Sequence, residues 1–393
     1  MRMFDMPQKA SEKNRKKRRL NVVRGKSKKK LIITLSVIAA IVIGLLLFQI
    51  LSPTGIYETI QNAYALTVDN GDNSFTDPQS EAVSFESTNN AAFLLTTSYF
   101  EIFNKKGNNV LYFKHGFSDP IMDTSNARVI VYDRGGKSYK IFNYSAALFE
   151  GNTAGNIISA DIGRNGSYAL ITESVGKASE LCVYSKNHSL EFKWYSEHNV
   201  ISSAVLNRWC DRVAVCELFV SSGAISSRID VMKIGKGEPE FSVDLNNTVI
   251  TSLTNCFGKI VAASENKIFI INWKNGEYTE IDLDGVISFM EVDNSGNLML
   301  TYARSDKQTF NTVLTLNDDL ETVSKTEINA VLSDVRTYDG ATYAVFDNTL
   351  HIYDAAGTLT EIKKSEYNIL KIAYMNRSNG IAACGTGKVF IIN

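Results

Sequence analysis

Short apolar runs alternate with turn residues over most of this chain. From about Glu81 to Asn393, stretches rich in Val, Ile, Phe and Tyr are separated by Gly, Asn and Asp. Runs of roughly five to seven β-branched and aromatic residues bounded by turn residues predict short strands. No long stretch in this region keeps the 3.6-residue period of a helix. The pattern therefore predicts an all-β fold for residues 81–393.

The strand openings repeat along the chain at intervals of 37 to 49 residues. The recurring segments are "AVSFEST" at Ala82, "PIMDTS" at Pro120, "IISADIG" at Ile157, "VISSAVL" at Val200, "VITSLT" at Val249, "VISFMEV" at Val286, "AVLSDVR" at Ala330 and "ILKIAYM" at Ile369. Each is followed by an apolar strand, a tight turn and an alternating strand, as in "GKIVAASENKIFIIN" from Gly258. Most units add a more polar fourth strand.

Four-stranded units repeated about every 40 residues are typical of a β-propeller. One such sheet cannot bury both of its apolar faces alone, but a ring of stacked sheets buries them all. The count favours eight blades, with seven as the alternative, and an array of β-sandwiches is the competing architecture. The last unit stops after its third strand, which leaves a sheet edge unpaired. We expect a segment before the first unit to complete it, either Ala63–Asp69, the first candidate, or Ser74–Gln79.

Leu31–Leu51, "LIITLSVIAAIVIGLLLFQIL", contains no charged residue. At 1.5 Å per residue it spans about 30 Å, the thickness of a bilayer core. The sequence therefore predicts one membrane helix. A cleaved signal peptide is the alternative, because Ala63-Tyr64-Ala65 resembles a peptidase site, but the apolar run is longer than the usual hydrophobic region of such peptides.

Charge is distributed unevenly on the two sides of this apolar segment. Residues 1–30 carry 13 Lys and Arg against two acids, whereas the remaining residues carry 28 basic and 40 acidic side chains. Basic residues beside a membrane helix stay on the cytoplasmic side. The prediction is a cytoplasmic basic tail (1–30), a transmembrane helix (31–51), a polar linker with a closing strand (52–80) and an extracytoplasmic propeller (81–393) in the cell membrane.

The basic tail has several conceivable partners. Next to a membrane helix, its natural partner is the anionic lipid headgroups. The run "KNRKKRRL" would also suit nucleic acid, but no aromatic residue follows Phe4 in the tail to stack on bases. We therefore expect lipid contact and no nucleic acid. Docking of a cytoplasmic signalling partner is a further alternative.

Five cysteines occur, an odd number, with no CxxC motif. Cys182, Cys216 and Cys384 lie inside apolar runs, where cysteine usually packs as a small hydrophobic residue. A Cys210–Cys216 bridge is conceivable. The chain is not a disulfide scaffold, even though its large domain is expected to face an oxidising compartment.

Two segments carry a family resemblance: "YDRGGKSYKIF" (Tyr132–Phe142) and "EFKWYS" (Glu191–Ser196). With the order of basic tail, apolar helix and propeller, they resemble a family of bacterial membrane-anchored propeller proteins classified as a domain of unknown function. The resemblance covers nearly the whole chain after the tail and implies an extracytoplasmic, single-pass placement, but it implies no activity. The chain lacks the Gly-His and Trp-Asp signature of WD40 repeats and has too few tryptophans for quinone-cofactor propellers.

The Gly-Lys-Ser of "RVIVYDRGGKSYKIF" resembles the end of a P-loop. A P-loop needs a glycine five residues before Gly136, where this chain has Val131, and a helix after the serine, where "SYKIF" alternates as a strand. We therefore expect no nucleotide site here. The four histidines are scattered and no G-x-S-x-G motif is present. The sequence accordingly gives no catalytic residue, no metal ligand and no cofactor.

Surface recognition is the remaining interpretation. In a propeller, the turns between second and third strands share a face with the blade-to-blade connections. Asp133, Arg134 and Lys137 would lie on that face, and Trp194 and Tyr195 would approach it. Aromatic and Arg side chains are favoured binding anchors. The alternative is that Trp194 packs between blades and Arg134 is a solvated turn residue.

Two functions follow from these expectations. The first is a binding or assembly module for an envelope protein or a cell-wall component. The second is an extracytoplasmic hydrolase or lyase with its site at the propeller funnel. Converging carboxylates with raised pKa values in the funnel would favour the enzyme, and an apolar patch on the top face would favour binding.

Overall fold

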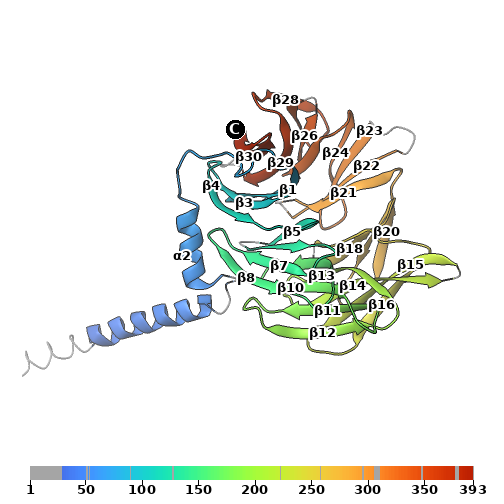
Figure 1. Ribbon diagram of the computed structural model, residues 1–393, viewed down its shortest axis with the longest axis horizontal. Helices are drawn as coiled ribbons and strands as arrows, with labels where there is room; N and C mark the ends of the chain where they lie inside the picture. Colours follow the sequence, from blue (N-terminus) through green and yellow to red (C-terminus); the bar gives the residue numbers. More distant parts are fainter. Residues whose placement is uncertain are drawn as a thin grey trace, which may run out of the picture. The chain divides into compact units, whose positions relative to one another are not determined.

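The computed structural model describes residues 29–393, apart from 50–51, 53, 89, 126–127, 222, 257, 294–295, 305–309, 347, 377–379 and 393. The basic tail expected at residues 1–30 lies almost wholly outside the described residues. The chain divides into two units, Met1–Ile56 and Tyr57–Asn393. The second unit contains all of the strands described below (Figure 1).

The first unit contains one long helix, Lys29–Gln49, with a mean hydropathy of 3.0. Its side chains are exposed along its whole length. The helix is therefore long and apolar enough to cross a membrane, as the uncharged stretch Leu31–Leu51 predicts. The last two residues of that stretch lie outside the described part of the chain.

The second unit is an eight-bladed β-propeller, so the first of the two predicted blade counts is confirmed. Blades 1 to 4 consist of β1 (Ala82–Ser87), β2 (Ala91–Thr96), β3 (Tyr99–Asn104) and β4 (Asn109–Lys114); β5 (Pro120–Ser125), β6 (Arg128–Asp133), β7 (Ser138–Phe142) and β8 (Ala147–Asn152); β9 (Ile157–Ile162), β10 (Tyr168–Glu173), β11 (Ser179–Tyr184) and β12 (Leu190–Ser196); and β13 (Val200–Leu206), β14 (Arg212–Ser221), β15 (Ala224–Lys233) and β16 (Pro239–Leu245).

Blades 5 to 8 follow the same order. They consist of β17 (Ser252–Cys256), β18 (Lys259–Ala263), β19 (Lys267–Ile271) and β20 (Tyr278–Asp282); β21 (Val286–Val292), β22 (Leu298–Ala303), β23 (Phe310–Leu316) and β24 (Thr322–Asn329); β25 (Asp334–Tyr338), β26 (Ala341–Phe346), β27 (Thr349–Tyr353) and β28 (Leu359–Lys364); and β29 (Ile369–Asn376), β30 (Gly380–Gly385) and β31 (Lys388–Ile392). Within each blade the strands pair antiparallel in sequence order.

The core lies between the blades rather than within any one of them. Among the described residues, eight clusters of buried apolar side chains occur, and each joins one blade to the next. One cluster packs Phe85 of β1 against Ala373 and Met375 of β29, so the last blade meets the first. This arrangement closes the ring and hides the apolar faces that a lone four-stranded sheet would expose.

The closing segment is not the one first predicted. Ala63–Asp69 does not form a strand: Ala63–Ala65 are the end of the helix α2 (Gly55–Ala65), and residues 66–69 belong to no strand. Instead, Ser74 pairs with Lys388 of β31, and the backbone N–H of Val389 donates to the Asn73 carbonyl oxygen at 2.9 Å. The second candidate, Ser74–Gln79, therefore contains the closing residue. The linker assignment of residues 52–80 missed α2 because its exposed face, not its buried face, is apolar.

The two faces of the ring are distinguished by their loops. The connection face carries the turns between second and third strands and the blade-to-blade connections. The helix face carries the other two turns of each blade, and α2 packs there: Asn62 Oδ1 accepts a hydrogen bond from the backbone N–H of Tyr144, in the turn between β7 and β8, at 3.1 Å.

Candidate binding surface

The turn after β6 lies on the connection face, as the sequence predicts. Asp133 Oδ1 accepts hydrogen bonds from the backbone N–H groups of Ser118 and Asp119, at 2.8 and 2.9 Å. Arg134 Nε lies 2.7 Å from Asp119 Oδ2 in an exposed ion pair. Exposed pairs contribute little to stability. Asp133 thus ties the connection from blade 1 to this turn, while Arg134 stays at the solvent boundary.

The backbone of the same turn holds the next connection as well. The N–H of Gly135 donates to the Ile157 carbonyl oxygen at 2.8 Å, and the N–H of Thr153 donates to that of Lys137 at 2.9 Å. Gly135 has φ +77°, a conformation that favours glycine. Ser138 then begins the strand β7, so no helix N-terminus follows Lys137. The Gly-Gly-Lys sequence therefore builds a turn that fastens two connections.

The two aromatic candidates in β12 have different environments. Trp194 is partly buried and packs against the core between blades 3 and 4. Tyr195 is partly exposed, with Lys193 Nζ 5.4 Å from its ring centroid. Trp194 therefore packs between blades, which was the alternative to a binding role. Asp133, Arg134 and Lys137 belong to blade 2, so the structure does not gather the five predicted residues into one cluster.

A group of exposed apolar residues on the connection face was, apart from Tyr195, missed by the sequence reasoning. We call it the apolar rim; it comprises Val175, Tyr195, Val200, Val220, Ile225 and Val249. Its members come from blades 3 and 4 and from the connections that follow them. Exposed apolar residues gathered on one face mark interaction sites more reliably than single ones do.

Backbone pairing places the segments that carry the apolar rim beside one another. The N–H of Ala178, in the turn that holds Val175, donates to the Ser196 carbonyl oxygen beside Tyr195 at 3.0 Å. Val200 pairs with Leu218 of β14. On the other side, the N–H of Ile250, next to Val249, donates to Ser227 Oγ of β15 at 2.9 Å. Val200 and Val249 therefore flank the β14–β15 hairpin.

This hairpin is longer than its neighbours. Its strands have ten residues each, and Figure 1 shows β15 reaching beyond the adjoining blades. Val220 and Ile225 are cross-strand partners near its end, 74% and 55% exposed. Arg228 forms a two-bond ion pair with Asp244, at 2.6 and 3.2 Å, nearer the base. The hairpin thus exposes aliphatic side chains at its end, and an ion pair stabilises the part nearer the blade.

The central channel contains carboxylates, which is the feature expected of the enzyme alternative. Arg336 of β25 lies among them: its Nε is 3.3 Å from Glu291 Oε2 and its Nη1 is 3.1 Å from Asp334 Oδ1. Burial raises the pKa of Glu291 to about 7, although Arg336 opposes the shift. Burial likewise raises the pKa of Glu86, on β1, to about 7, with repulsion from Asp123 adding to it.

Three channel aspartates bind the next blade. Asp123 accepts a hydrogen bond from the backbone N–H of Ile162 at 2.8 Å, and Asp161 accepts one from Leu206 at 2.9 Å. Asp334 does the same for Ile372, also at 2.8 Å. Each of these bonds runs from the first strand of one blade to the first strand of the next. Burial and mutual repulsion raise the pKa of Asp123, and burial raises that of Asp161.

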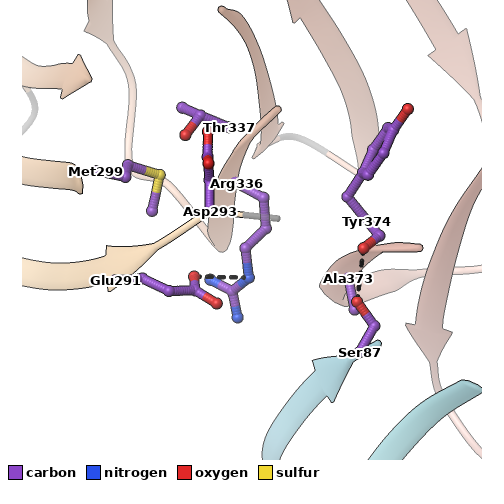
Figure 2. Close-up of a pocket in the computed structure, with 8 residues that line it drawn as sticks. All are labelled: Ser87, Glu291, Asp293, Met299, Arg336, Thr337, Ala373 and Tyr374. Carbon is purple, nitrogen blue, oxygen red and sulfur yellow. Dashed lines mark hydrogen bonds and ion pairs between the residues drawn. The ribbon is translucent and has the colours of Figure 1, made fainter. Parts of the chain in front are cut away.

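The space beside Arg336 is small. Figure 2 shows the guanidinium group directed at Glu291, with Asp293 and Thr337 close by. The cavity lined by these residues has a volume of about 20 Å³. That volume holds about one water molecule, whereas sites for metabolites usually enclose hundreds of Å³. Among the described residues, no group of three His, Cys, Asp or Glu is arranged to hold a metal ion.

The fold and the blade closure define the protein as an eight-bladed β-propeller. Residues 67–393 match the model of the Family of unknown function (DUF5711), and the chain belongs to that family. Among solved structures it is similar to the C-terminal WD40 domain of Sif2, with a TM-score of 0.54, 12% identity, and coverage of 80% of this chain and 97% of that one. This likeness shows the fold alone. No curated protein matches the chain.

Proposed function

We propose that the protein is a single-pass membrane protein that displays its propeller outside the cell and binds another envelope protein through the apolar rim. The carrying observation is the exposed aliphatic end of the β14–β15 hairpin, Val220 and Ile225, on the face that the sequence predicts for recognition. The orientation rests on the basic tail preceding the apolar helix.

The chemistry of the rim favours a protein over a cell-wall polymer. Five of its six residues are aliphatic, and aliphatic side chains neither stack on sugar rings nor hydrogen-bond their hydroxyl groups. Charged pairs surround it, including Lys177 with Glu197 and Arg228 with Asp244. An apolar centre within a polar margin is the usual anatomy of a protein–protein interface. Tyr195 supplies an aromatic anchor at its edge.

The enzyme alternative is supported by one observation and opposed by another. The raised pKa values of Glu86 and Glu291 suit acid–base chemistry at neutral pH. However, the cavity beside Glu291 and Arg336 has room for about one water molecule, and the donors of Arg336 are directed at protein oxygens, including the Phe85 carbonyl at 3.3 Å. The charged groups of the channel are therefore better placed to hold the blades together than to bind and convert a substrate.

Site-specific photocross-linking in intact cells tests the binding proposal. A photoreactive residue at Ile225 is expected to give one discrete protein adduct, and Val220→Asp is expected to abolish it. The same residue at Leu359, exposed on the outer strand β28, is the matched control. Equal labelling at both positions would contradict the proposal. A diffuse product removed by a wall hydrolase would instead identify a cell-wall partner and overturn the assignment to a protein.

Orientation is tested separately. With the wall removed and a known external protein digested, added protease is expected to cleave the region after Glu81. Survival of that region would show that the propeller lies inside the cell.

A further inference from the structure

Helix α2 exposes its apolar face and buries its polar face. Tyr57, Ile60 and Tyr64 are 74%, 64% and 77% exposed. Their spacing of three and four residues places them on one side of the helix. Glu58 and Asn62, on the opposite side, are buried against the propeller. A helix at the surface of a globular protein usually has the reverse arrangement.

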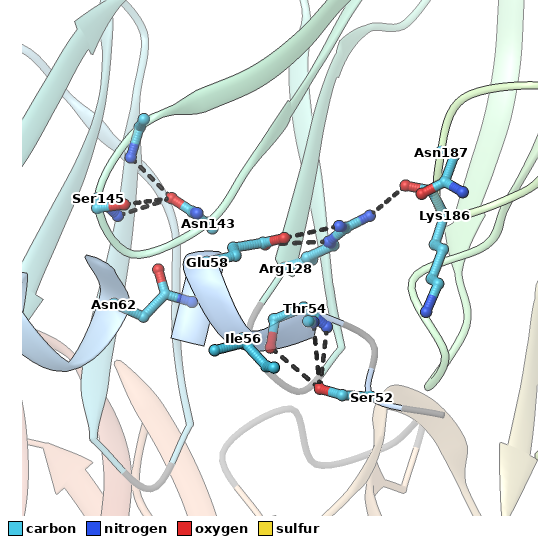
Figure 3. Close-up of polar contacts among 12 residues, drawn as sticks. Ser52, Thr54, Ile56, Glu58, Asn62, Arg128, Asn143, Ser145, Lys186 and Asn187 are labelled. Atoms are coloured by element: carbon cyan, nitrogen blue, oxygen red, sulfur yellow. Dashed lines mark hydrogen bonds and ion pairs between the residues drawn. The ribbon is translucent and has the colours of Figure 1, made fainter. Parts of the chain in front are cut away.

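Polar bonds fix this orientation. Arg128, the first residue of β6, holds both carboxylate oxygens of Glu58: Nε lies 3.2 Å from Oε1 and Nη2 lies 2.9 Å from Oε2. Its Nη1 donates to the Lys186 carbonyl oxygen at 2.6 Å (Figure 3). Arg128 thereby joins α2 to blades 2 and 3. Rotation of the helix to bury its tyrosines would break this bidentate ion pair.

Charge on the helix face is divided between two halves of the ring. The helix-face loops of blades 1 to 3 contain no acidic residue and four basic ones: Lys105, Lys106, Arg164 and Lys186. Lys106 forms an ion pair with Asp69 of the preceding segment. The corresponding loops of blades 6 and 7 are acidic: Asp293, Asp318, Asp319, Glu321, Asp339 and Asp354. α2 bonds to blades 2 and 3. The exposed apolar stripe therefore lies on the basic half.

An exposed tryptophan extends this half. Trp209, between β13 and β14 in blade 4, is 75% exposed, and the guanidinium carbon of Arg208 lies 5.7 Å from its ring centroid. Tryptophan and tyrosine are enriched at membrane–water interfaces, where one part of the ring is apolar and the other reaches water. Basic residues beside them attract anionic headgroups, each contributing about 1 kcal/mol near the surface.

We propose that the stripe Tyr57, Ile60 and Tyr64, with the basic half of the helix face, binds the surface of a lipid bilayer that carries anionic headgroups. Tyr57 follows Leu51 by six residues, a reach of at most about 20 Å, so the stripe cannot leave the neighbourhood of a membrane entered by the apolar helix. This step rests on the proposed membrane anchor. The acidic loops of blades 6 and 7 are repelled by the same surface, so the propeller is held with blades 1 to 3 closest to the lipid.

Fluorescence quenching on the full chain in lipid nanodiscs tests the proposal. An environment-sensitive dye is attached at Tyr64→Cys, and at Val220→Cys on the connection face as the matched control; the native cysteines are buried and do not compete. The discs contain doxyl-labelled lipid in either a zwitterionic bilayer or one with about one third phosphatidylglycerol. We expect quenching at position 64 to exceed that at position 220 severalfold and to increase with the anionic lipid.

Charge reversal supplies the second arm of the test. Arg164→Glu combined with Arg208→Glu is expected to remove the increase caused by phosphatidylglycerol, with an unchanged near-ultraviolet circular dichroism spectrum. Equal, weak quenching at positions 64 and 220 would overturn the proposal, as would quenching that ignores both lipid charge and charge reversal. Failure of the anchor is a separate outcome, because a chain without a membrane helix would not enter the discs at all.

Discussion

The backbone N–H of Phe75 donates to the carbonyl oxygen of Gly387 at 2.8 Å, joining residues from opposite ends of the propeller sequence. The Phe75 side chain is buried in the core between blades 8 and 1. Glu101 adds to this closure, since both of its carboxylate oxygens accept a hydrogen bond from the N–H of Thr76, at 2.9 and 3.2 Å. A very short segment therefore completes the eighth blade.

Phe75→Ala is expected to lower the free energy of unfolding by about 3 kcal/mol, because a buried phenylalanine is removed and leaves a cavity. Hydrogen exchange should rise first in β31, β3 and β4, the strands that bond to the closing segment. Tyr112→Ala, on the exposed outer strand β4, is the control and should change stability by less than about 0.5 kcal/mol. A uniform rise in exchange over all blades would show that the closure is not a separate structural unit.

Glu58→Ala is expected to destabilise the docked helix by about 3 kcal/mol, because it leaves the guanidinium group of Arg128 buried without its partner. Amide exchange in residues 57–65 should increase more than in the blades. In a double-mutant cycle, Arg128→Met added to Glu58→Ala should cost much less than the sum of the single changes. Strict additivity would mean that the pair does not hold α2.

The stability of the ring should fall as pH rises from about 6.5 to 8. The pKa of Glu86 is raised by burial from 4.5 to about 7, so the folded chain holds a proton that the unfolded chain has already released. Stability is then highest below the unfolded pKa and decreases through the folded one. Across this window the loss is at most about 1 kcal/mol for Glu86, because it is partly exposed to the channel.

The urea midpoint at pH 6.5 and 8 measures this loss, and Glu86→Gln should reduce the difference between them. Glutamine keeps an oxygen for the Thr124 hydroxyl, which lies 2.7 Å from Glu86 Oε2. The window begins at 6.5 because burial lowers the pKa of His188 to about 4, which gives the opposite slope at lower pH. An identical pH dependence in the variant and the parent would exclude Glu86 as its source.

All five cysteines should be free and unreactive in the native protein. Each is buried, and the conceivable Cys210–Cys216 bridge is not formed. Burial raises the pKa of Cys384 and Cys182 to about 12 and that of Cys210 to about 11, so little thiolate is present at neutral pH. A thiol reagent should therefore titrate none of them until a denaturant is added, and then five. Fewer than five after unfolding would indicate a disulfide.

The strand pattern was predictable because it is a local property. Turn residues and alternation locate β6 and β7 from "RVIVYD" and "SYKIF", and the repeat spacing gives the blade number. Helix α2 was missed because its pattern is inverted: the buried positions are Glu58 and Asn62, and no apolar stripe marks a buried side. The buried role of Glu58 can be recognised only when the structure shows that Arg128 of β6 lies opposite it.

The candidate site was predicted less well than the fold. Blade topology places the predicted turn residues on the connection face, and Tyr195 lies at the edge of the apolar rim. Val220 and Ile225 read as ordinary strand residues, and only the unusual length of β14 and β15 signals that their ends extend past the blade. The ion pair of Arg336 could not be predicted from the sequence, because its partner Glu291 belongs to another blade and lies 45 positions away in the chain.

The order of contacts along the chain has a mechanical consequence. From the N-terminal side, the chain first reaches α2, fastened by Glu58 and Arg128, and only then the closing residue Ser74, paired with Lys388. Tension applied through a membrane helix would act on the Glu58–Arg128 ion pair before it acted on the pairing of Ser74 with Lys388. In the proposed membrane-anchored chain, α2 would therefore take up such tension first and protect a ring that is closed by only a few hydrogen bonds.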